Sequence, residues 1–188
     1  DKVAVVTGGS RGIGEMISAG FLASGAKVYI SSRKAEVCDA TAERLSSKYG
    51  GECISLPSDL SNLDGIKSLV NKLNSKESKL DILVNNAGVA WGAPLDEYPE
   101  TGWDKVMDTN VKGVFFLTQK LLPLLREGAK QEPSRVVNIG SIDGLTAGIF
   151  ENYAYGPSKA ALHHLTKILA ANLIKEKIIV NAIAPGPF

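Results

Sequence analysis

A tyrosine and a lysine stand four positions apart in the stretch YGPSKAALHHL, as Tyr155 and Lys159. Residues at this spacing lie on one face of a helix, so the lysine ammonium can sit beside the tyrosine ring. A free tyrosine has a pKa of about 10 and exchanges protons poorly near neutral pH. A neighbouring cation stabilises the phenolate. The pair therefore predicts a group that transfers a proton to or from a bound molecule.

The same stretch contains a second tyrosine, Tyr153, which has Pro157 four positions later and no charge there. We therefore take Tyr155 as the candidate and expect Tyr153 to pack or to line the rim of a pocket. Pro157 is tolerated if the helix begins close by, since first-turn amides have no partner within a helix. The motif alone is common, and its ordinary interpretation is a half-exposed helical pair. The elements around it must decide.

Short apolar runs alternate with stretches of helical spacing along the whole chain. The runs begin at Val3, Lys27, Glu52, Leu80, Arg135 and Ile178, and the helical stretches cover residues 12–24, 35–49, 63–75, 101–126 and 153–175. Nearly continuous apolar runs are typical of strands that are covered on both faces. This order predicts an α/β fold, a single doubly wound parallel sheet with helices on both faces. Ligands of such sheets bind outside the carboxyl ends of the strands.

Composition indicates one globular domain over residues 1–188, with 44% hydrophobic and 22% charged residues and a net charge of +1. There is no basic excess for nucleic acid or anionic lipid and no apolar segment long enough for a bilayer. Cys38 and Cys53 lack metal-ligand spacing and are expected to be free thiols. His163 and His164 are adjacent, so a helix would point them in different directions. We expect two surface or interface side chains and no metal site.

A glycine-rich turn, TGGSRGIG, joins the first strand to the first helix. Its spacing is G-x-x-x-G-x-G, which does not match the general dinucleotide fingerprint. The physical argument still applies, because glycines allow a tight turn and let the backbone approach a pyrophosphate. The free amides at the helix start then face the anion. Alone, such a turn can be a plain strand-to-helix connection.

The second strand, which ends in VYISSR, has no acidic residue for the ribose hydroxyl of NAD, usually found about 20 residues beyond the turn. It ends instead at Arg33, whose planar cation suits a 2′-phosphate. Arg11, inside the glycine turn, offers a second cation. The two arginines favour NADP(H), although each alone would be read as a solvated surface side chain.

Short motifs spread in order along the chain resemble those of the short-chain dehydrogenase/reductase family. They are TGGSRGIG at 7–14, SDL at 58–60, NNAG at 85–88, NVKG from Asn110, IGS ending at Ser141, YGPSK at 155–159 and APG at 184–186. Within the family the chain is similar to the β-ketoacyl reductases, especially the branch associated with rhamnolipid-type lipid synthesis. The resemblance implies a Rossmann fold and an NADP(H)-dependent reduction of a carbonyl group.

The resemblance also implies a role for each catalytic candidate. Tyr155 is the general acid for the carbonyl oxygen, and Lys159 supports it and binds the nicotinamide ribose. Ser141 donates a hydrogen bond to the developing alkoxide. Asn110 holds a water in a proton relay that reaches Lys159. Outside this family, Ser141 would be read as a turn cap and Asn110 as an ordinary polar helix residue.

The cofactor is expected to contact residues that follow several strands. The predicted set is Gly8, Ser10, Arg11, Gly12, Ile13, Gly14, Arg33, Asp59, Leu60, Asn86, Ala87, Gly88, Tyr155, Lys159, Pro185 and Gly186. Asp59 and Leu60 should lie beside the adenine, although an acid here also suits a helix N-terminus. Asn85 is expected to brace neighbouring strands instead.

The predicted substrate class is a 3-oxoacyl thioester, with secondary ketones, sterols, sugars and alkaloid-like ketones as alternatives. A non-catalytic NADP-binding protein on the same fold is a further alternative, and the intact Tyr, Lys and Ser set argues against it. By resemblance, helices at 106–125 and 160–173 pair across a two-fold axis in a homodimer or homotetramer. Family members continue past PG with a substrate loop, a helix and a last strand, so we expect the natural protein to be longer and cytoplasmic, with an N-terminal signal left open.

Overall fold

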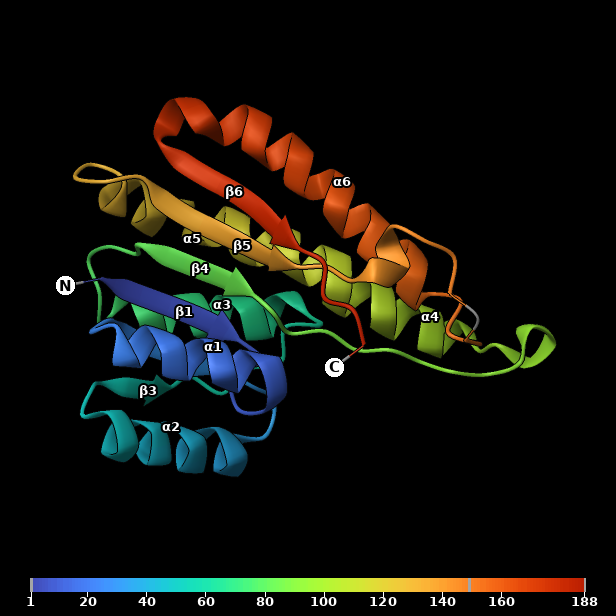
Figure 1. Ribbon diagram of the computed structural model, residues 1–188, viewed down its shortest axis with the longest axis horizontal. Coiled ribbons are helices and arrows are strands. Elements are labelled where there is room, and N and C mark those ends of the chain that lie inside the picture. The colour runs from blue at the N-terminus through green and yellow to red at the C-terminus, as the bar shows by residue number, and fades with distance from the viewer. Residues whose placement is uncertain (1, 149, 188) are drawn as a thin grey trace.

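The computed structural model describes residues 2–148 and 150–187 and has six parallel strands in one sheet (Figure 1). The strands are β1 (Val3–Thr7), β2 (Lys27–Ser31), β3 (Cys53–Ser55), β4 (Ile82–Asn85), β5 (Ser134–Ile139) and β6 (Ile178–Ile183). The helices are α1 (Gly12–Ala23), α2 (Ala35–Tyr49), α3 (Leu63–Asn74), α4 (Glu100–Met107), α5 (Gly113–Gly128) and α6 (Tyr155–Leu173). Short helical turns cover Leu95–Glu97, Ile142–Gly144 and Ile174–Glu176, and Asp108–Lys112 forms a π-helix.

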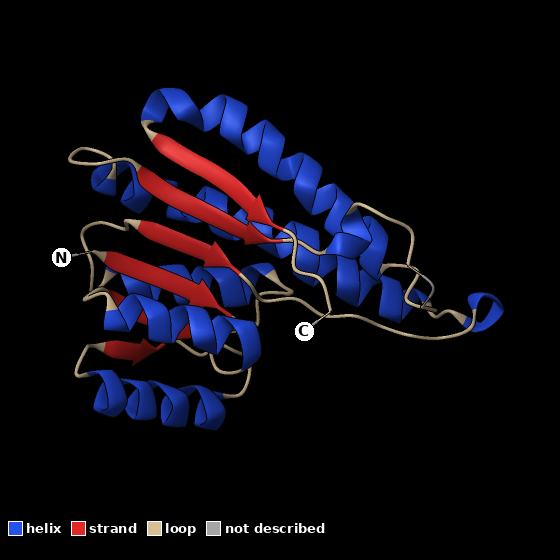
Figure 2. Cartoon of the chain, in the orientation of Figure 1, coloured by secondary structure: helices blue, strands red, loops and turns tan. Residues whose placement is uncertain are grey.

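The strands lie in the order β3-β2-β1-β4-β5-β6, which is the doubly wound order of dinucleotide-binding sheets. The chain moves outward from β1 to β3, then crosses back and adds β4 on the other side of β1. All the strand arrows in Figure 2 point the same way, so their carboxyl ends share one edge. The crevice between the carboxyl ends of β1 and β4 is therefore the expected ligand site. The α/β prediction is confirmed.

Helices cover both faces of the sheet and form two apolar layers. One layer packs α3, α5 and the end of α6 against the strands, with residues such as Leu69, Leu83 and Leu121 fully buried. The other packs α1 and α2 and includes Cys38 and Cys53, which are buried free thiols. In Figure 1 α1 lies in front of the strands, and α3 and α5 lie behind them. Burial on both faces explains the continuous apolar runs in the sequence.

Two helices differ from the sequence prediction. The helix expected from residue 153 begins at Tyr155, whose amide donates to Asn152 O at 2.8 Å. The helix expected over 101–126 is divided by the π-helix at Asp108–Lys112. A π turn keeps every residue helical in appearance but shifts the hydrogen-bond register by one, and such turns are common at functional sites. Hydrophobic spacing does not reveal that shift.

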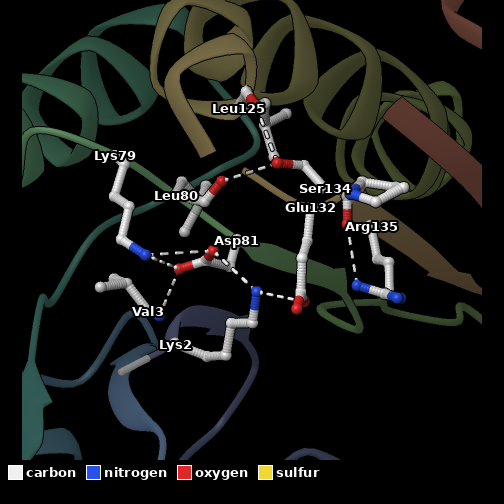
Figure 3. Close-up of polar contacts among 10 residues, drawn as sticks. Lys2, Val3, Lys79, Leu80, Asp81, Leu125, Glu132, Ser134 and Arg135 are labelled. Carbon is white, nitrogen blue, oxygen red and sulfur yellow. Dashed lines mark hydrogen bonds and ion pairs between the residues drawn. The ribbon is translucent and has the colours of Figure 1, made fainter. Parts of the chain in front are cut away.

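The opposite, amino-terminal edge of the sheet is fastened by Asp81, just before β4 (Figure 3). Its side chain is 2% exposed and accepts a hydrogen bond from Val3 N at 2.8 Å. The ammonium groups of Lys2 and Lys79 lie 3.5 and 3.1 Å from its carboxylate oxygens. Burial alone raises the pKa of Asp81, but the Val3 amide, Lys79 and Lys2 together outweigh it and lower the pKa. One carboxylate thus joins β1, β4 and the preceding loop.

We predict that Asp81→Ala lowers the free energy of unfolding by about 1–3 kcal/mol, because it leaves the buried Val3 amide without its acceptor. A group with a lowered pKa stabilises the fold above its unfolded pKa of about 3.9 and loses that contribution as the pH falls further. The difference between Asp81→Ala and the unchanged protein should therefore shrink below about pH 4. Urea unfolding over pH 3–7 measures it, with the exposed Asp64→Ala as control. A difference that is constant over this range would contradict the assignment.

Candidate active site

The glycine-rich turn between β1 and α1 forms one wall of an open groove. Gly8 and Gly12 have φ angles of +64° and +54°, a conformation that side-chain-bearing residues rarely adopt. A Cβ on Gly14 would lie 2.3 Å from Gly8 O, so only glycine lets α1 approach the turn this closely. The first amides of α1 receive no side-chain cap from Arg11. They lie at the amino-terminal end of the helix, which borders the groove. This is an anion-binding geometry.

The groove has a volume of about 710 Å³ and runs along the carboxyl ends of β1, β2 and β4. All the predicted cofactor residues of the first three strand ends line it: Gly8, Ser10, Arg11, Gly12, Ile13, Gly14, Arg33, Asp59 and Leu60, together with Asn86, Ala87 and Gly88. The sequence prediction missed Lys34 and Thr109, which also line it. Lys34 directly follows Arg33, and a run of two cations at this strand end was a usable signal.

Three cations face the end of the groove beyond β2. Arg11, Arg33 and Lys34 are exposed and, within residues 2–148 and 150–187, form no ion pair. No carboxylate ends β2, where Ser31 and Ser32 line the groove instead. This end of the groove is therefore electropositive and suited to a phosphate group.

Two polar residues of the groove are engaged in the protein's own turns. Asp59 Oδ1 accepts from Ser61 N at 3.0 Å and Ser61 Oγ at 2.8 Å. Asn86 Nδ2 donates to Thr7 O at 2.9 Å and to Gly8 O at 3.3 Å. The backbone N–H of Asn86 also donates to Thr7 Oγ1 at 3.0 Å, so Asn86 fastens the loop after β4 to the glycine turn. Asn85 donates to Asn138 Oδ1 on the neighbouring strand at 2.8 Å, the bracing role expected for it.

A second cavity, of about 340 Å³, adjoins the groove and contains the catalytic candidates Ser141, Tyr155 and Lys159. Pro185 and Gly186, after β6, also line it. Both cavities share Ile13, Asn86, Gly88 and Val89, so they lie next to each other. Residues separated by more than a hundred positions thus meet at one edge of the sheet.

Lys159 is buried beneath Tyr155 at the start of α6. Its side chain is 4% exposed, and Nζ lies 5.6 Å from the centre of the Tyr155 ring. Nζ donates to Ile139 O, the last residue of β5, at 2.7 Å. Burial lowers the pKa of Lys159 to about 8. The four-residue spacing of Tyr155 and Lys159 thus corresponds to a contact in the structure. The ammonium group lies against the tyrosine ring, and its pKa of about 8 is close to neutral pH.

Ser141 follows β5 and lies in the cavity with Tyr155 and Lys159. Its hydroxyl oxygen accepts from Asp143 N at 3.2 Å, the cap of the short Ile142–Gly144 helix. The hydroxyl proton is left to donate toward the cavity, because the cap uses only an oxygen lone pair. The cap and the site role expected for Ser141 are thus compatible.

Asn110 lies in the π-helix and is fully buried, outside the two cavities. Its Oδ1 accepts from Val89 N and its Nδ2 donates to Val89 O, both at 2.9 Å, so it clamps the loop after β4. Nδ2 also donates to Ser158 Oγ at 2.9 Å, beside Lys159. A Cβ on Gly88 would lie 3.4 Å from both Asn110 Oδ1 and Lys159 Nζ. Asn110 is therefore behind the cavity wall, and Ser158, which the sequence prediction missed, links it to α6.

The rim of the cavity joins the loops after β4 and β5. Ala93 N donates to Glu151 O at 3.0 Å, and the rings of Tyr98 and Tyr153 meet edge to face at 5.8 Å. Tyr153 thus packs at the rim, as expected, while Tyr155 lines the cavity. Apolar side chains of the same loops, Leu95, Leu145 and Phe150, are about 70% exposed or slightly less. These two loops thus expose apolar side chains in the single chain.

Comparison with known proteins agrees with this geometry. The family model described as short chain dehydrogenase matches residues 2–188. The chain belongs to the short-chain dehydrogenase family. It is 54% identical over 188 residues to the rhamnolipids biosynthesis 3-oxoacyl-[acyl-carrier-protein] reductase of Pseudomonas aeruginosa, covering 100% of this chain and 73% of the relative. It is 34% identical over 185 residues to the 3-oxoacyl-[acyl-carrier-protein] reductase FabG of Aquifex aeolicus, covering 98% and 73%.

Solved structures give the same picture. The Pseudomonas aeruginosa RhlG/NADP active-site complex matches with a TM-score of 0.95 at 54% identity, covering 100% of this chain and 73% of that one. The L-sorbose reductase of Gluconobacter frateurii, complexed with NADPH and L-sorbose, matches with a TM-score of 0.92 at 31% identity, covering 98% and 69%. The chain is thus a short-chain dehydrogenase/reductase enzyme, and its resemblance to the ketoacyl reductases is confirmed. No helix in the described part of the chain is both long and apolar enough to cross a membrane.

We predict opposite effects for two glycine substitutions in α1. Gly14→Ala forces a Cβ against Gly8 O and should lower the free energy of unfolding by about 1–3 kcal/mol. Gly20 has open space around its Cβ position, so Gly20→Ala should raise it by about 0.5–1 kcal/mol through better helix propensity. Urea unfolding of both variants checks the pair. Equal effects would show that α1 does not pack on the glycine turn as described.

Proposed function

We propose that this protein is an NADP(H)-dependent reductase that converts the ketone of a 3-oxoacyl thioester to a secondary alcohol. One observation carries the proposal: the cavity that holds Ser141, Tyr155 and Lys159 lies directly beside the glycine-lined, electropositive groove and shares four lining residues with it. A dinucleotide bound along the groove would therefore end at the proton-donating group. The 3-oxoacyl reductases among its relatives support the substrate class.

The groove fits NADP(H) better than NAD(H). The glycine turn and the first amides of α1 would take the pyrophosphate. Arg11 and Arg33, with Lys34 beside them, would surround a 2′-phosphate, and no acid at the end of β2 would compete for the ribose. Two structures similar to this chain are complexes with NADP or NADPH. When bound, the cofactor supplies the hydride.

In the proposed reduction, Tyr155 gives its hydroxyl proton to the carbonyl oxygen as hydride reaches the carbonyl carbon. Lys159 lies 5.6 Å from the Tyr155 ring centre, where its positive charge stabilises the phenolate that remains. Ser141 donates a hydrogen bond to the oxygen on which negative charge develops. Oxidation of the alcohol uses the same groups in reverse.

Asn110 belongs to the proposed set as the residue that connects Lys159 to the rest of the site. Its side chain is occupied by Val89 and Ser158. The backbone carbonyl of the π turn is thus the group left to hold a relay water. In this proposal the side chain keeps the loop after β4 in place, and the proton route runs past the backbone.

Two alternatives follow from specific observations. The similarity to an L-sorbose reductase, solved with NADPH and L-sorbose, favours a polyhydroxy ketone as the second candidate substrate. The exposed apolar side chains Leu95, Leu145 and Phe150, in the loops after β4 and β5, favour an acyl chain instead. A homodimer or homotetramer is also proposed, because apolar residues such as Ile168 on α6 remain exposed in the single chain.

Arg33 tests the cofactor assignment. We expect Arg33→Ala to raise the Michaelis constant for NADPH about 10–100-fold, the effect of one charge-assisted hydrogen bond, and to leave that for NADH unchanged. Initial rates with 3-oxoacyl thioesters and both cofactors measure it. Arg44→Ala is the matched control, because Arg44 pairs with Glu15 away from the groove. A protein that already prefers NADH would remove the role given to Arg33.

Tyr155 tests the chemical step, and Tyr153 provides its control in the same stretch. We expect Tyr155→Phe to lower kcat by about 10²–10⁴-fold, as for loss of a general acid, with NADPH affinity preserved. Tyr153→Phe keeps the ring at the rim and should keep the rate. Stopped-flow rates and NADPH fluorescence titration separate the two quantities. Unchanged turnover in Tyr155→Phe would rule out the acid role.

A further inference from the structure

A second residue of α6, His163, lies behind the site, one turn beyond Lys159. The sequence prediction placed His163 and His164 on a surface or interface, whereas the half-buried His163 turns both of its ring nitrogens into the interior of the single chain. Within the described part of the chain these nitrogens form no hydrogen bond of ordinary geometry, although the backbone of Gly144 lies against the ring. His164 is exposed. The two neighbours differ because only His163 shares the inward face of the helix with Lys159.

The ring of His163 occupies the space beside Gly140. A Cβ on Gly140 would lie 1.9 Å from Nε2 and 2.5 Å from Cδ2 of His163. Gly140 does not have the positive φ that would itself demand glycine. The lack of a side chain at position 140 is therefore required by the imidazole ring and not by the backbone.

Gly140 sits between two residues that the proposed chemistry uses. Ile139 O holds the ammonium group of Lys159, and Ser141 lines the catalytic cavity. On the far side, Gly140 N donates to Ile183 O at 2.7 Å, at the end of β6. The segment 139–141 is thus fixed between the backbone of β6 and the ring of His163.

The surroundings of His163 disfavour its charged form. Burial lowers the pKa of His163, Lys159 and Lys167 lower it further, and a backbone hydrogen bond with Gly144 opposes them. Buried nitrogens without well-formed hydrogen bonds carry a desolvation cost that an apolar side chain of the same shape would not have. The ring therefore occupies the space beside Gly140 at a cost to stability.

We propose that His163 is a positioning residue whose ring, fitted against Gly140, fixes the Ile139–Ser141 segment and with it Lys159 and the Ser141 hydroxyl. The effect on catalysis rests on the proposed function. A misplacement of about 1 Å at a reacting group can cost about 100-fold in rate. The contact would thus act mainly on kcat, because the glycine turn and the cations of the nucleotide groove do not belong to this segment.

A double-mutant cycle tests this positioning role. Gly140→Ala should lower kcat about 100-fold and change the NADPH dissociation constant far less, because the glycine turn and the cations of the groove keep their positions. His163→Ala opens the space that the new methyl group needs, so the double variant should recover most of the rate lost in Gly140→Ala. His163→Ala alone should lower kcat about tenfold, a smaller displacement, and His164→Ala should leave it unchanged.

Two results would overturn the proposal. One is a double variant as slow as Gly140→Ala, and the other is a His163→Ala rate equal to that of His164→Ala. General packing would lower the stability of each variant without this split between kcat and the binding constants. If Gly140→Ala does not fold, recovery of folded protein in the double variant becomes the measurement, and its absence counts against the proposal.

The same cycle separates this inference from the proposed reaction. The free energy of unfolding, measured without substrate, should show the same coupling, with Gly140→Ala less destabilising in the His163→Ala background. A protein that reduces no ketone but shows this coupling would keep the steric contact and refute the reductase proposal. Independent effects on unfolding would refute the contact itself.

Discussion

The site depends on keeping one ammonium group inside the protein. Lys159 is almost fully buried, and burial disfavours its charge. The hydrogen bond to Ile139 O offsets part of the desolvation cost of Lys159. The same bond joins the end of β5 to the start of α6. The loop after β4, the π turn and the ring of His163 all close around this bond. A charge that would be unremarkable on the surface thus organises three segments that are distant in sequence.

The two edges of the sheet are built for different tasks. At the amino-terminal edge, Asp81 satisfies the Val3 amide and attracts two lysines, so charge there is neutralised locally. At the carboxyl-terminal edge, Arg11 and Arg33 have no ion pair within the described ranges, and the amides of α1 are uncapped by Arg11. The carboxyl-terminal edge therefore has an excess of positive charge, as expected for an edge that binds an anion. The amino-terminal edge has balanced charges, as expected for an edge that only supports the fold.

Sequence reasoning predicted the elements that follow from local patterns. Apolar runs gave the strands, the glycine turn gave the junction of β1 and α1, and the spacing of Tyr155 and Lys159 gave their shared face. Each of these features depends on residues that lie close together in the sequence. The groove residues of the strand ends were also found, because parallel strands bring their carboxyl ends to one edge.

The features that were missed depend on contacts between distant segments. The π turn at Asn110 leaves the apolar spacing of a helix intact, so only the hydrogen-bond register reveals it. The burial of His163 depends on a glycine 23 positions earlier, in a strand end that the sequence gives no reason to pair with it. The clamp of Asn110 on Val89 crosses from one loop to another element. No local pattern contains such information.

The buried lysine also ties the site to its chemical surroundings. In the proposed reaction Lys159, whose pKa burial lowers to about 8, would help to return a proton to Tyr155 after each cycle. Reducing a ketone with a dinucleotide consumes one proton, so the equilibrium moves about tenfold toward the ketone for each unit of rising pH. A rise in pH would therefore shift the reaction from the alcohol toward the ketone. The pH of the surroundings thus sets the direction of the reaction together with the ratio of reduced to oxidised dinucleotide.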